Sequence, residues 1–130
     1  AISEFYSLSR QDTLPICVNI IGASEFHRIG PGAAAARTRE IVGDRPVYLS
    51  FDIDSLDPAY APGTGTPVWG GLSSAQAAAL LRALAGINIR GGDVVEVSPP
   101  FDTTGATAIA GAHVATELCQ LLGWRMRSDG

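Results

Sequence analysis

The chain has 130 residues, of which 46% are hydrophobic and 17% charged, and its net charge is −4. This composition is too apolar and too weakly charged for a disordered polymer, and it fits one compact α/β domain or a piece of a larger one. Nine arginines, no lysine and thirteen acidic residues leave no strongly basic face, which argues against nucleic acid or an anionic membrane as the partner. No apolar run reaches the ~20 residues of a membrane helix, and Ala1–Arg10 lacks the basic start and apolar core of a signal peptide.

The first elements predicted along the chain are two strands around one helix. The β-branched run Ile16–Ile21 predicts a buried strand, whereas residues 1–15 match no pattern and stay unassigned. Ser24 is expected to cap the short turn "EFHRIGP", after which the helix formers in "GAAAARTREIVG" predict a helix that ends at Gly43. Pro46–Phe51 predicts a second buried strand.

A long loop and a second helix occupy the middle of the chain. The loop, Asp52–Gly71, is rich in Pro and Gly, and loops of this length in compact domains are usually functional or disordered. Ser73 and Gln76 form a capping-box pattern, which predicts a helix that begins after Ser73 and ends at Gly86.

A third strand and a long helix are predicted in the remainder of the chain. Asp93–Ser98 is an apolar run that Pro99 ends. Thr103 or Thr104 is expected to begin the last helix. Its apolar residues recur at helical spacing, namely Ala110, Val114, Leu118 and Leu121. Residues 124–130 are polar and predict a frayed tail.

The order of these elements, β-α-β-loop-α-β-α, indicates an α/β fold with a parallel sheet, because near-continuously apolar strands alternate with helices. We expect a three-layer α/β/α sandwich. Three strands and three helices are too few to build such a sheet and cover both of its faces. Residues 1–130 therefore predict one partial domain, the rest of which lies outside this sequence.

Asp52 and Asp54 are the residues that most clearly indicate a chemical site, because they follow an apolar strand directly. Residues two apart in an extended strand point to the same side and lie ~6.6 Å apart along it. Two carboxylates so placed can hold one divalent cation or a pair of cations. Without a cation they repel each other, and one tends to stay protonated. The alternative is that one Asp caps a turn and the other is solvated.

Three kinds of chemistry compete for this Asp-x-Asp motif. A calcium loop is excluded, because Leu56 and Asp57 stand where it needs Asp or Asn and then Gly. A phosphatase that forms an aspartyl-phosphate is disfavoured, because such enzymes prefer Thr or Val where Leu56 stands. A glycosyltransferase that holds Mn²⁺ against a nucleotide diphosphate remains open.

The segment "SFDIDSLDPAYAPGTGTPVWGGL" resembles the third signature of the ureohydrolase family, which comprises arginases, agmatinases and related amidinohydrolases. The positions that satisfy this signature are Ser50, Phe51, Asp52, Asp54, Pro58, Pro62, Gly63 and Gly71. The later segment "GDVVEVSPPFD" is similar to another segment of the family and puts Glu96 at its glutamate position. The resemblance covers Ile21–Gly123 and is strongest to the agmatinase branch.

The resemblance implies manganese-dependent hydrolysis of a small guanidino compound to urea and an amine, with agmatine and putrescine as the favoured substrate and product. Asp52 would bridge two Mn²⁺ ions, Asp54 would bind one of them, and a hydroxide shared by the ions would attack the guanidinium carbon. Glu96 would accept hydrogen bonds from the guanidinium. Guanidinobutyrase, arginase or another guanidino-acid amidinohydrolase is the alternative within the family. The resemblance also implies a homo-oligomer when the protein is full length.

The family's remaining metal ligands do not occur in this sequence. They come from an earlier His-containing segment and from a D-A-H-x-D segment, whereas the chain has only His27 and His113. We expect His27 to be a surface or turn histidine and His113 a helix-packing or interface residue. Asp52 and Asp54 alone are too few ligands for two ions. The chain therefore resembles the C-terminal part of a ureohydrolase and is expected to be inactive by itself; the alternative from another class is a truncated, non-catalytic homologue that only packs with other subunits.

Several residues outside these motifs carry weaker expectations. Cys17 and Cys119 lie in apolar segments, which predicts two buried reduced thiols and a cytoplasmic protein. Trp69 either forms a wall of the pocket or covers the loop. Thr64 and Thr66 bond either to the neighbouring carboxylates or to the loop itself.

Overall fold

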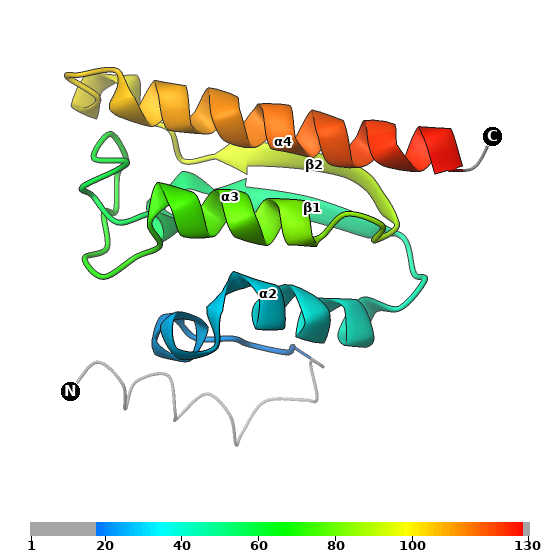
Figure 1. Ribbon diagram of the computed structural model, residues 1–130. Coiled ribbons are helices and arrows are strands. Elements are labelled where there is room, and N and C mark those ends of the chain that lie inside the picture. The colour runs from blue at the N-terminus through cyan, green and yellow to red at the C-terminus, as the bar shows by residue number, and fades with distance from the viewer. Residues whose placement is uncertain (1–17, 129–130) are drawn as a thin grey trace.

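The computed structural model describes residues 18–128, of which residues 125–128 are described by their backbone alone. In chain order the elements are α2 (Ala23–Val42), β1 (Val47–Asp52), the 3₁₀ turn η2 (Ile53–Ser55), α3 (Ser74–Ala83), β2 (Ile89–Val95), the 3₁₀ turn η3 (Pro99–Phe101) and α4 (Ala106–Ser128). β1 and β2 are neighbours in the sheet, and α3 lies between them in the chain (Figure 1). This alternation of strands and helices is that of an α/β fold.

β1 and β2 run parallel, and their register determines which residues meet where the strands end. The pairs run from Val47 with Ile89 to Asp52 with Val95, with one irregularity after the first pair. A parallel pair needs a crossover connection, usually through a helix, and α3 supplies it here. The predicted α/β class with a parallel sheet is therefore confirmed.

α2 begins earlier than predicted, because most of the expected turn "EFHRIGP" is helical, and Ser24 lies inside this helix without capping it. The helix is kinked at Gly30, whose φ of 79° lies in the left-handed region that glycine adopts readily. Pro31 follows and cannot donate the N–H that a continuous helix needs. The predicted end is confirmed, since Gly43 has a φ of 55° and its N–H donates to the Arg39 carbonyl at 2.9 Å.

α3 begins as predicted, with a capping box. The Ser73 hydroxyl accepts a hydrogen bond from the Gln76 N–H at 3.1 Å, and the Gln76 side-chain oxygen accepts one from the Ser73 N–H at 2.9 Å. Two N–H groups that the helix itself leaves without partners are satisfied in this way. The helix ends at Ala83, a few residues before the predicted stop at Gly86.

β2 begins and ends earlier than the predicted strand Asp93–Ser98. The sequence pattern did not predict the beginning of β2, which contains Gly91 and Gly92, because glycine is depleted in strands. Gly92 is needed for close packing, since a Cβ atom there would lie 2.6 Å from the Leu49 carbonyl oxygen and 3.4 Å from a leucine of α4. The strand ends before Glu96, whose φ of 65° is incompatible with an extended strand.

α4 is capped by Asp102 as well as by one of the two threonines expected to begin it, because the Thr104 hydroxyl accepts from the Ala106 N–H at 3.3 Å. The Asp102 carboxylate accepts hydrogen bonds from the N–H groups of Thr107, at 3.1 Å, and Ala108, at 2.8 Å. A negative charge at this position also favours the positive end of the helix dipole. Asp102 lies several residues before Ala106, the first residue of α4. A pattern that looks for a capping residue directly before the helix therefore does not identify it.

The rest of α4 confirms its predicted apolar side and extends past its predicted end. Val114, Leu118 and Leu121 are buried. Cys119 was predicted to be buried but is exposed, because it lies beside that apolar side; Cys17 lies outside the described residues. The helical backbone continues from Gly123 to Ser128, where a frayed tail was predicted, and residues 129–130 are not described. Neither α4 nor any other helix within residues 18–128 is long and apolar enough to cross a membrane.

The predicted strand Ile16–Ile21 is wrong for the part that the structure describes. Residues 18–22 have no regular secondary structure, and Val18 and Ile20 are 63% and 56% exposed. Residues 16 and 17 lie outside the described part. A strand needs a hydrogen-bonded neighbour, and within residues 18–128 the sheet contains only the pair β1 and β2, which this apolar run does not join.

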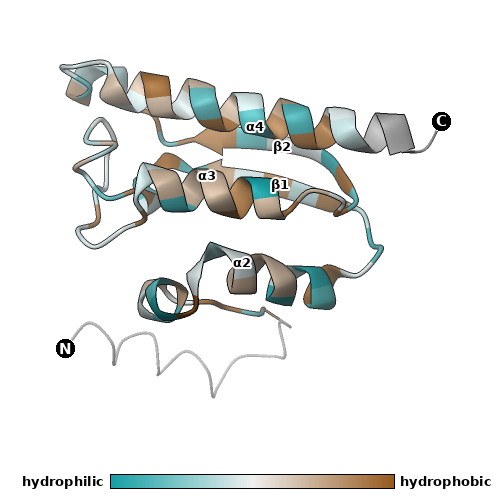
Figure 2. Cartoon of the chain, viewed as in Figure 1, coloured by the Kyte–Doolittle hydropathy of each residue, from teal (hydrophilic) through white to brown (hydrophobic). Residues whose placement is uncertain are grey.

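The helices cover one face of the sheet. α3 lies between α2 and α4 and packs against both (Figure 1). Polar and apolar residues are interspersed along the helices, as expected when one side of each is buried (Figure 2). The core that joins the helices to the sheet includes Ala35, Phe51 and Leu81, whereas Tyr48 and Ser50 on the other face of β1 are exposed. Residues 18–128 therefore contain two of the three predicted layers.

We expect Gly92→Ala to destabilise the protein, because the new methyl group would collide with the backbone of β1. Side-chain rotation cannot relieve a collision with backbone, so the free energy of unfolding should fall by about 1–3 kcal/mol. Gly65→Ala is the matched control, because nothing lies within 4 Å of its Cβ position. Urea unfolding measures both variants, and equal stability of the two would contradict this account of the packing.

Candidate active site

Asp52 and Asp54 lie where β1 ends, and a turn brings them together. β1 ends at Asp52, and Asp54 belongs to η2. Oδ1 of Asp52 accepts a hydrogen bond from the Asp54 N–H at 3.1 Å, which caps this turn. The expectation that both residues share one side of an extended strand is therefore wrong, although their carboxyl groups do lie close enough to influence each other.

The acids around Asp52 repel one another. Although its side chain is exposed, partial desolvation raises the pKa of Asp52 above the ordinary value. The Asp54 N–H opposes this shift, whereas the carboxyl group of Asp54 and the charge of Glu96 raise the pKa further. None of the ion pairs within residues 18–128 involves these three acids. A divalent cation at this point would relieve the repulsion.

Glu96 lies at the corresponding point of the neighbouring strand. Asp52 is paired with Val95, the last residue of β2, and Glu96 follows Val95. Within residues 18–128, Glu96 is the only residue other than glycine that has a positive φ, at 65°. This conformation costs about 1–2 kcal/mol for a residue with a Cβ atom. The register of the two strands therefore brings all three predicted site residues to one edge of the sheet.

The loop that follows η2 returns to Asp54. The Thr66 hydroxyl donates a hydrogen bond to Oδ2 of Asp54 at 2.5 Å. Thr64 behaves differently, because it is 3% exposed and its hydroxyl has no hydrogen-bond partner in the described part of the chain. Of the two interpretations left open for these threonines, bonding to a site carboxylate holds for Thr66. This contact orients one of the predicted metal ligands.

Hydrogen bonds close the loop at its base. The Asp57 N–H donates to the Leu72 carbonyl at 2.9 Å, and the Leu72 N–H donates to the Ser55 carbonyl at 2.8 Å. The Asp57 carboxylate accepts from the N–H groups of Ala59, at 2.9 Å, and Gly70, at 2.8 Å. These two bonds hold the pKa of Asp57 below its ordinary value. The loop is therefore anchored at both ends beside the two acids.

Neither histidine joins the acids. His27 is an exposed residue of α2, and its Nε2 atom lies 2.9 Å from the Gly70 carbonyl oxygen. His113 is a residue of α4, and its Nε2 atom lies 3.4 Å from the buried Glu117 carboxylate. The surface position predicted for His27 is confirmed. The helix-packing or interface position predicted for His113 is not confirmed, because its side chain is 57% exposed and its contact with Glu117 lies within α4. Trp69 was expected either to form a wall of the pocket or to cover the loop. It does neither, because 93% of its surface is exposed.

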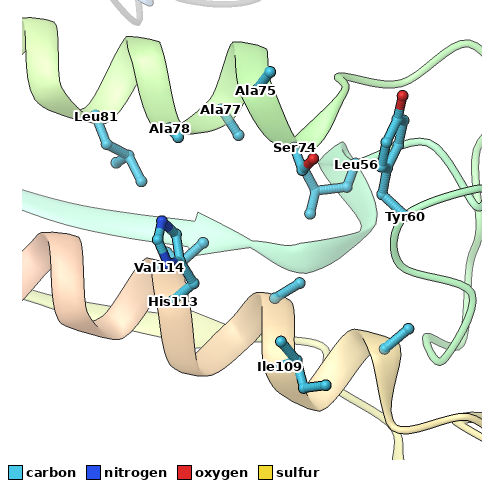
Figure 3. A pocket seen from close by; sticks show the side chains of 12 residues that line it. Leu56, Tyr60, Ser74, Ala75, Ala77, Ala78, Leu81, Ile109, His113 and Val114 are labelled. Carbon is cyan, nitrogen blue, oxygen red and sulfur yellow. The ribbon is translucent and has the colours of Figure 1, made fainter.

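A groove of about 470 Å³ lies between α3 and α4 (Figure 3). Its lining is mostly apolar and includes Leu56, Tyr60, Leu81, Ile109, His113 and Val114. Asp52, Asp54 and Glu96 do not line it. The groove is therefore separate from the edge of the sheet where the three acids meet.

The sequence analysis missed a polar network on the exposed face of the sheet. The Tyr48 hydroxyl donates to Oδ2 of Asp93 at 2.9 Å, and the Ser50 hydroxyl donates to Oδ1 of the same residue at 2.6 Å. The hydrogen bond to Asp93 raises the pKa of Tyr48 above its ordinary value. The available signal was the alternation in "VYLSFD", which places Tyr48, Ser50 and Asp52 on one face.

Asp52 and Asp54 fit divalent manganese by their chemistry, because carboxylate oxygens are hard donors. They form only part of a ligand set. In the part of the chain that the structure describes, no group of three or more His, Cys, Asp or Glu side chains is arranged to hold a metal ion. A complete site for two ions would need further donors.

Comparison with known proteins places this arrangement in a family context. The model of the Arginase family matches residues 3–120. The chain is 53% identical to a guanidinopropionase from Pseudomonas aeruginosa and 50% identical to an agmatinase from Chromobacterium violaceum, each over 105 residues. Both matches cover 81% of this chain and 33% of the relative, so the chain spans about a third of the length of these relatives. A guanidinobutyrase from Pseudomonas aeruginosa is 57% identical over 89 residues, which are 68% of this chain and 28% of that protein.

Solved structures agree on the fold. The crystal structure of a hypothetical agmatinase from Burkholderia thailandensis superposes with a TM-score of 0.82 at 54% identity, covering 92% of this chain and 37% of that chain. Proclavaminate amidino hydrolase from Streptomyces clavuligerus superposes with a TM-score of 0.81 at 43% identity, covering 88% of this chain and 40% of that chain. These likenesses support the α/β class derived from the elements themselves.

We expect Glu96→Gly to leave the free energy of unfolding within about 1 kcal/mol of the wild-type value. Glycine removes the left-handed penalty of about 1–2 kcal/mol, and the greater entropy of the unfolded chain offsets about 0.5–1 kcal/mol of that gain. Val95→Gly is the control, because its extended backbone gains nothing from glycine, while the unfolded chain gains the same conformational entropy. Chemical denaturation measures both; equal destabilisation would show that the backbone of Glu96 stores no strain.

Proposed function

This chain belongs to the arginase family, and we propose that it contributes Asp52, Asp54 and Glu96 to the active site of a ureohydrolase. The observation that carries the proposal is the meeting of these three acids where β1 and β2 end. Ligand sites of open parallel sheets form at this edge. We propose the activity for a protein of the relatives' full length, of which this chain spans about a third.

Asp52 and Asp54 are the residues that would hold manganese. Their hard oxygen donors suit Mn²⁺. Partial desolvation and the neighbouring acids raise the pKa of Asp52, and a cation would oppose that shift by favouring the charged carboxylate. When bound, manganese lowers the pKa of water toward neutrality and so makes a nucleophile available. Thr66 would keep Asp54 in one orientation by its hydrogen bond to Oδ2.

Glu96 would bind the guanidinium group of the substrate. A guanidinium is planar and presents paired N–H donors, which a carboxylate accepts in a charge-assisted and bidentate manner. The reaction adds the oxygen of water to the guanidino carbon and breaks the bond from that carbon to the substituted nitrogen. The nitrogen takes up a proton and leaves as the amine, and the remaining carbon and its two nitrogens leave as urea. Glu96 would hold the reacting carbon beside Asp52 and Asp54 during these steps.

Agmatine is the substrate that we favour, with putrescine and urea as products. Agmatinases are among the relatives, but a guanidinopropionase and a guanidinobutyrase are at least as similar in sequence. Guanidinopropionate and guanidinobutyrate are therefore the competing substrates, with arginine as a further one. All of them share the guanidinium that Glu96 would bind, so the residues that contact the other end of the molecule decide between them. Membership of the arginase family argues against the glycosyltransferase alternative.

We propose that residues 1–130 by themselves release no urea, because two carboxylates are too few ligands for two ions. The alternative from a different class is a non-catalytic homologue that only packs with other subunits. Urea release by the protein of full length distinguishes these two possibilities.

In the presence of Mn²⁺, the full-length protein should hydrolyse agmatine with a kcat/KM about tenfold or more above the values for arginine, guanidinobutyrate and guanidinopropionate. A coupled assay for urea measures all four substrates. A higher kcat/KM for one of the guanidino acids would make that compound the proposed substrate. No urea release from any of the four compounds would favour the non-catalytic homologue.

Substitutions of Asp52 and of Glu96 should have different effects in the full-length protein. Asp52→Asn removes a charged oxygen donor, so the affinity for Mn²⁺ should fall by about tenfold or more and urea release should be lost. Glu96→Gln should keep the affinity for Mn²⁺ and lower kcat/KM, because it weakens the contact with the guanidinium. Calorimetry with Mn²⁺ and the urea assay measure both; loss of metal together with normal kinetics in metal-loaded Glu96→Gln would reverse the two assignments.

A further inference from the structure

His27 joins three parts of the molecule: α2, the loop 56–72 and the beginning of α3. Its Nε2 atom lies 2.9 Å from the Gly70 carbonyl oxygen, and its Nδ1 atom lies 3.4 Å from Nε2 of Gln76. Both partners are more than 40 positions away in the sequence. We propose that His27 is a positioning residue, which holds the loop in the place from which it orients Asp54.

The hydrogen bonds determine which ring nitrogen of His27 carries the hydrogen. Oε1 of Gln76 accepts from the Ser73 N–H in the capping box at 2.9 Å, so the other polar atom of that side chain, Nε2, is a donor. Nδ1 of His27 is therefore the acceptor of this contact. Nε2 of His27 carries the hydrogen and donates it to the Gly70 carbonyl. The capping box of α3 thus selects the form of His27 that binds the loop.

Gly70 is held by both of its backbone polar groups. Its N–H donates to the Asp57 carboxylate at 2.8 Å, and its carbonyl accepts from His27. Its φ of 85° is one that glycine adopts without strain. Asp57 belongs to the loop itself, whereas His27 belongs to α2, so His27 is the contact that ties Gly70 to the helical layer.

The position of Gly70 bears on the candidate site through a short stretch of chain. Thr66 precedes Gly70 by four residues and donates its hydroxyl to Asp54 at 2.5 Å. Pro67 lies between Thr66 and Gly70 and restricts the backbone there. A displacement of Gly70 should therefore also displace Thr66. That the orientation of Asp54 matters for catalysis rests on the proposed function. The contact of His27 with the loop is independent of the proposed function.

The chain offers a matched control on the same helix. Nη2 of Arg39 donates to the carbonyls of Ala83, at 2.8 Å, and Ala85, at 3.2 Å. Arg39 therefore also ties α2 to α3 by side-chain hydrogen bonds to backbone carbonyls. Its partners lie at the opposite end of α3 from the loop. Arg39→Leu thus loosens the packing of the two helices without touching Gly70.

Hydrogen–deuterium exchange of the full-length protein tests the proposal without reference to activity. In His27→Leu, the Gly70 and Leu72 amides should exchange about fivefold or more faster than in the wild type, because the loop has lost a hydrogen bond that holds it closed. His27→Gln keeps an N–H donor near the position of Nε2, so its loop should exchange within about twofold of the wild-type rate. Arg39→Leu should leave the exchange of the loop unchanged.

Three outcomes would overturn the proposal: unchanged exchange of the loop in His27→Leu, equally fast exchange in His27→Gln, or equal acceleration by Arg39→Leu. Should His27→Leu fail to fold, His27→Asn replaces it, because the shorter amide does not reach the Gly70 carbonyl and should also accelerate exchange. Urea release adds a second readout, in which kcat/KM falls in His27→Leu and is retained in His27→Gln. If the wild type releases no urea, the proposed function has failed, and the exchange rates still decide the role of His27.

Discussion

The parallel register between β1 and β2 is the constraint on which the meeting of Glu96 with Asp52 and Asp54 depends. Because Asp52 is paired with Val95, both strands end at the same level, and Glu96 emerges beside Asp52. Partial desolvation, together with the charges that meet there, raises the pKa of Asp52. A slip of the pairing by one residue would turn the residues of one strand to opposite faces. Glu96 therefore joins the two aspartates at this edge only in the observed register.

Unfavourable local features gather at the same edge and are held there by their surroundings. Glu96 has a left-handed backbone, and the Thr64 hydroxyl is buried without a partner in the described residues. Such features persist only where neighbouring structure imposes them, and they concentrate at functional sites. Here the loop is tied to both strands' ends, because Thr66 donates to Asp54 and the Gly63 carbonyl accepts from the Ser98 N–H at 2.8 Å.

Patterns within a few residues were enough to predict much of this molecule. The capping box of Ser73 and the helix stop at Gly43 are satisfied by hydrogen bonds that span three or four positions, so the residues that decide them are adjacent in the sequence. The alternation of apolar strands with helices likewise predicted the α/β class and the parallel pair. The motif around Asp52 and Asp54, together with Glu96, predicted which residues meet at the edge of the sheet.

Contacts between distant segments decided the remainder. The apolar run Ile16–Ile21 is typical of a strand, but its described residues pair with neither β1 nor β2. Gly92 weakens the strand pattern, yet only glycine fits beside β1 beneath α4. Asp52 and Asp54 meet through a 3₁₀ turn that no alternation rule contains. His27 has a role only because the fold brings the Gly70 carbonyl to it. A strand, a close approach and a side-chain hydrogen bond each need a partner, and the partner's position is a property of the packed chain.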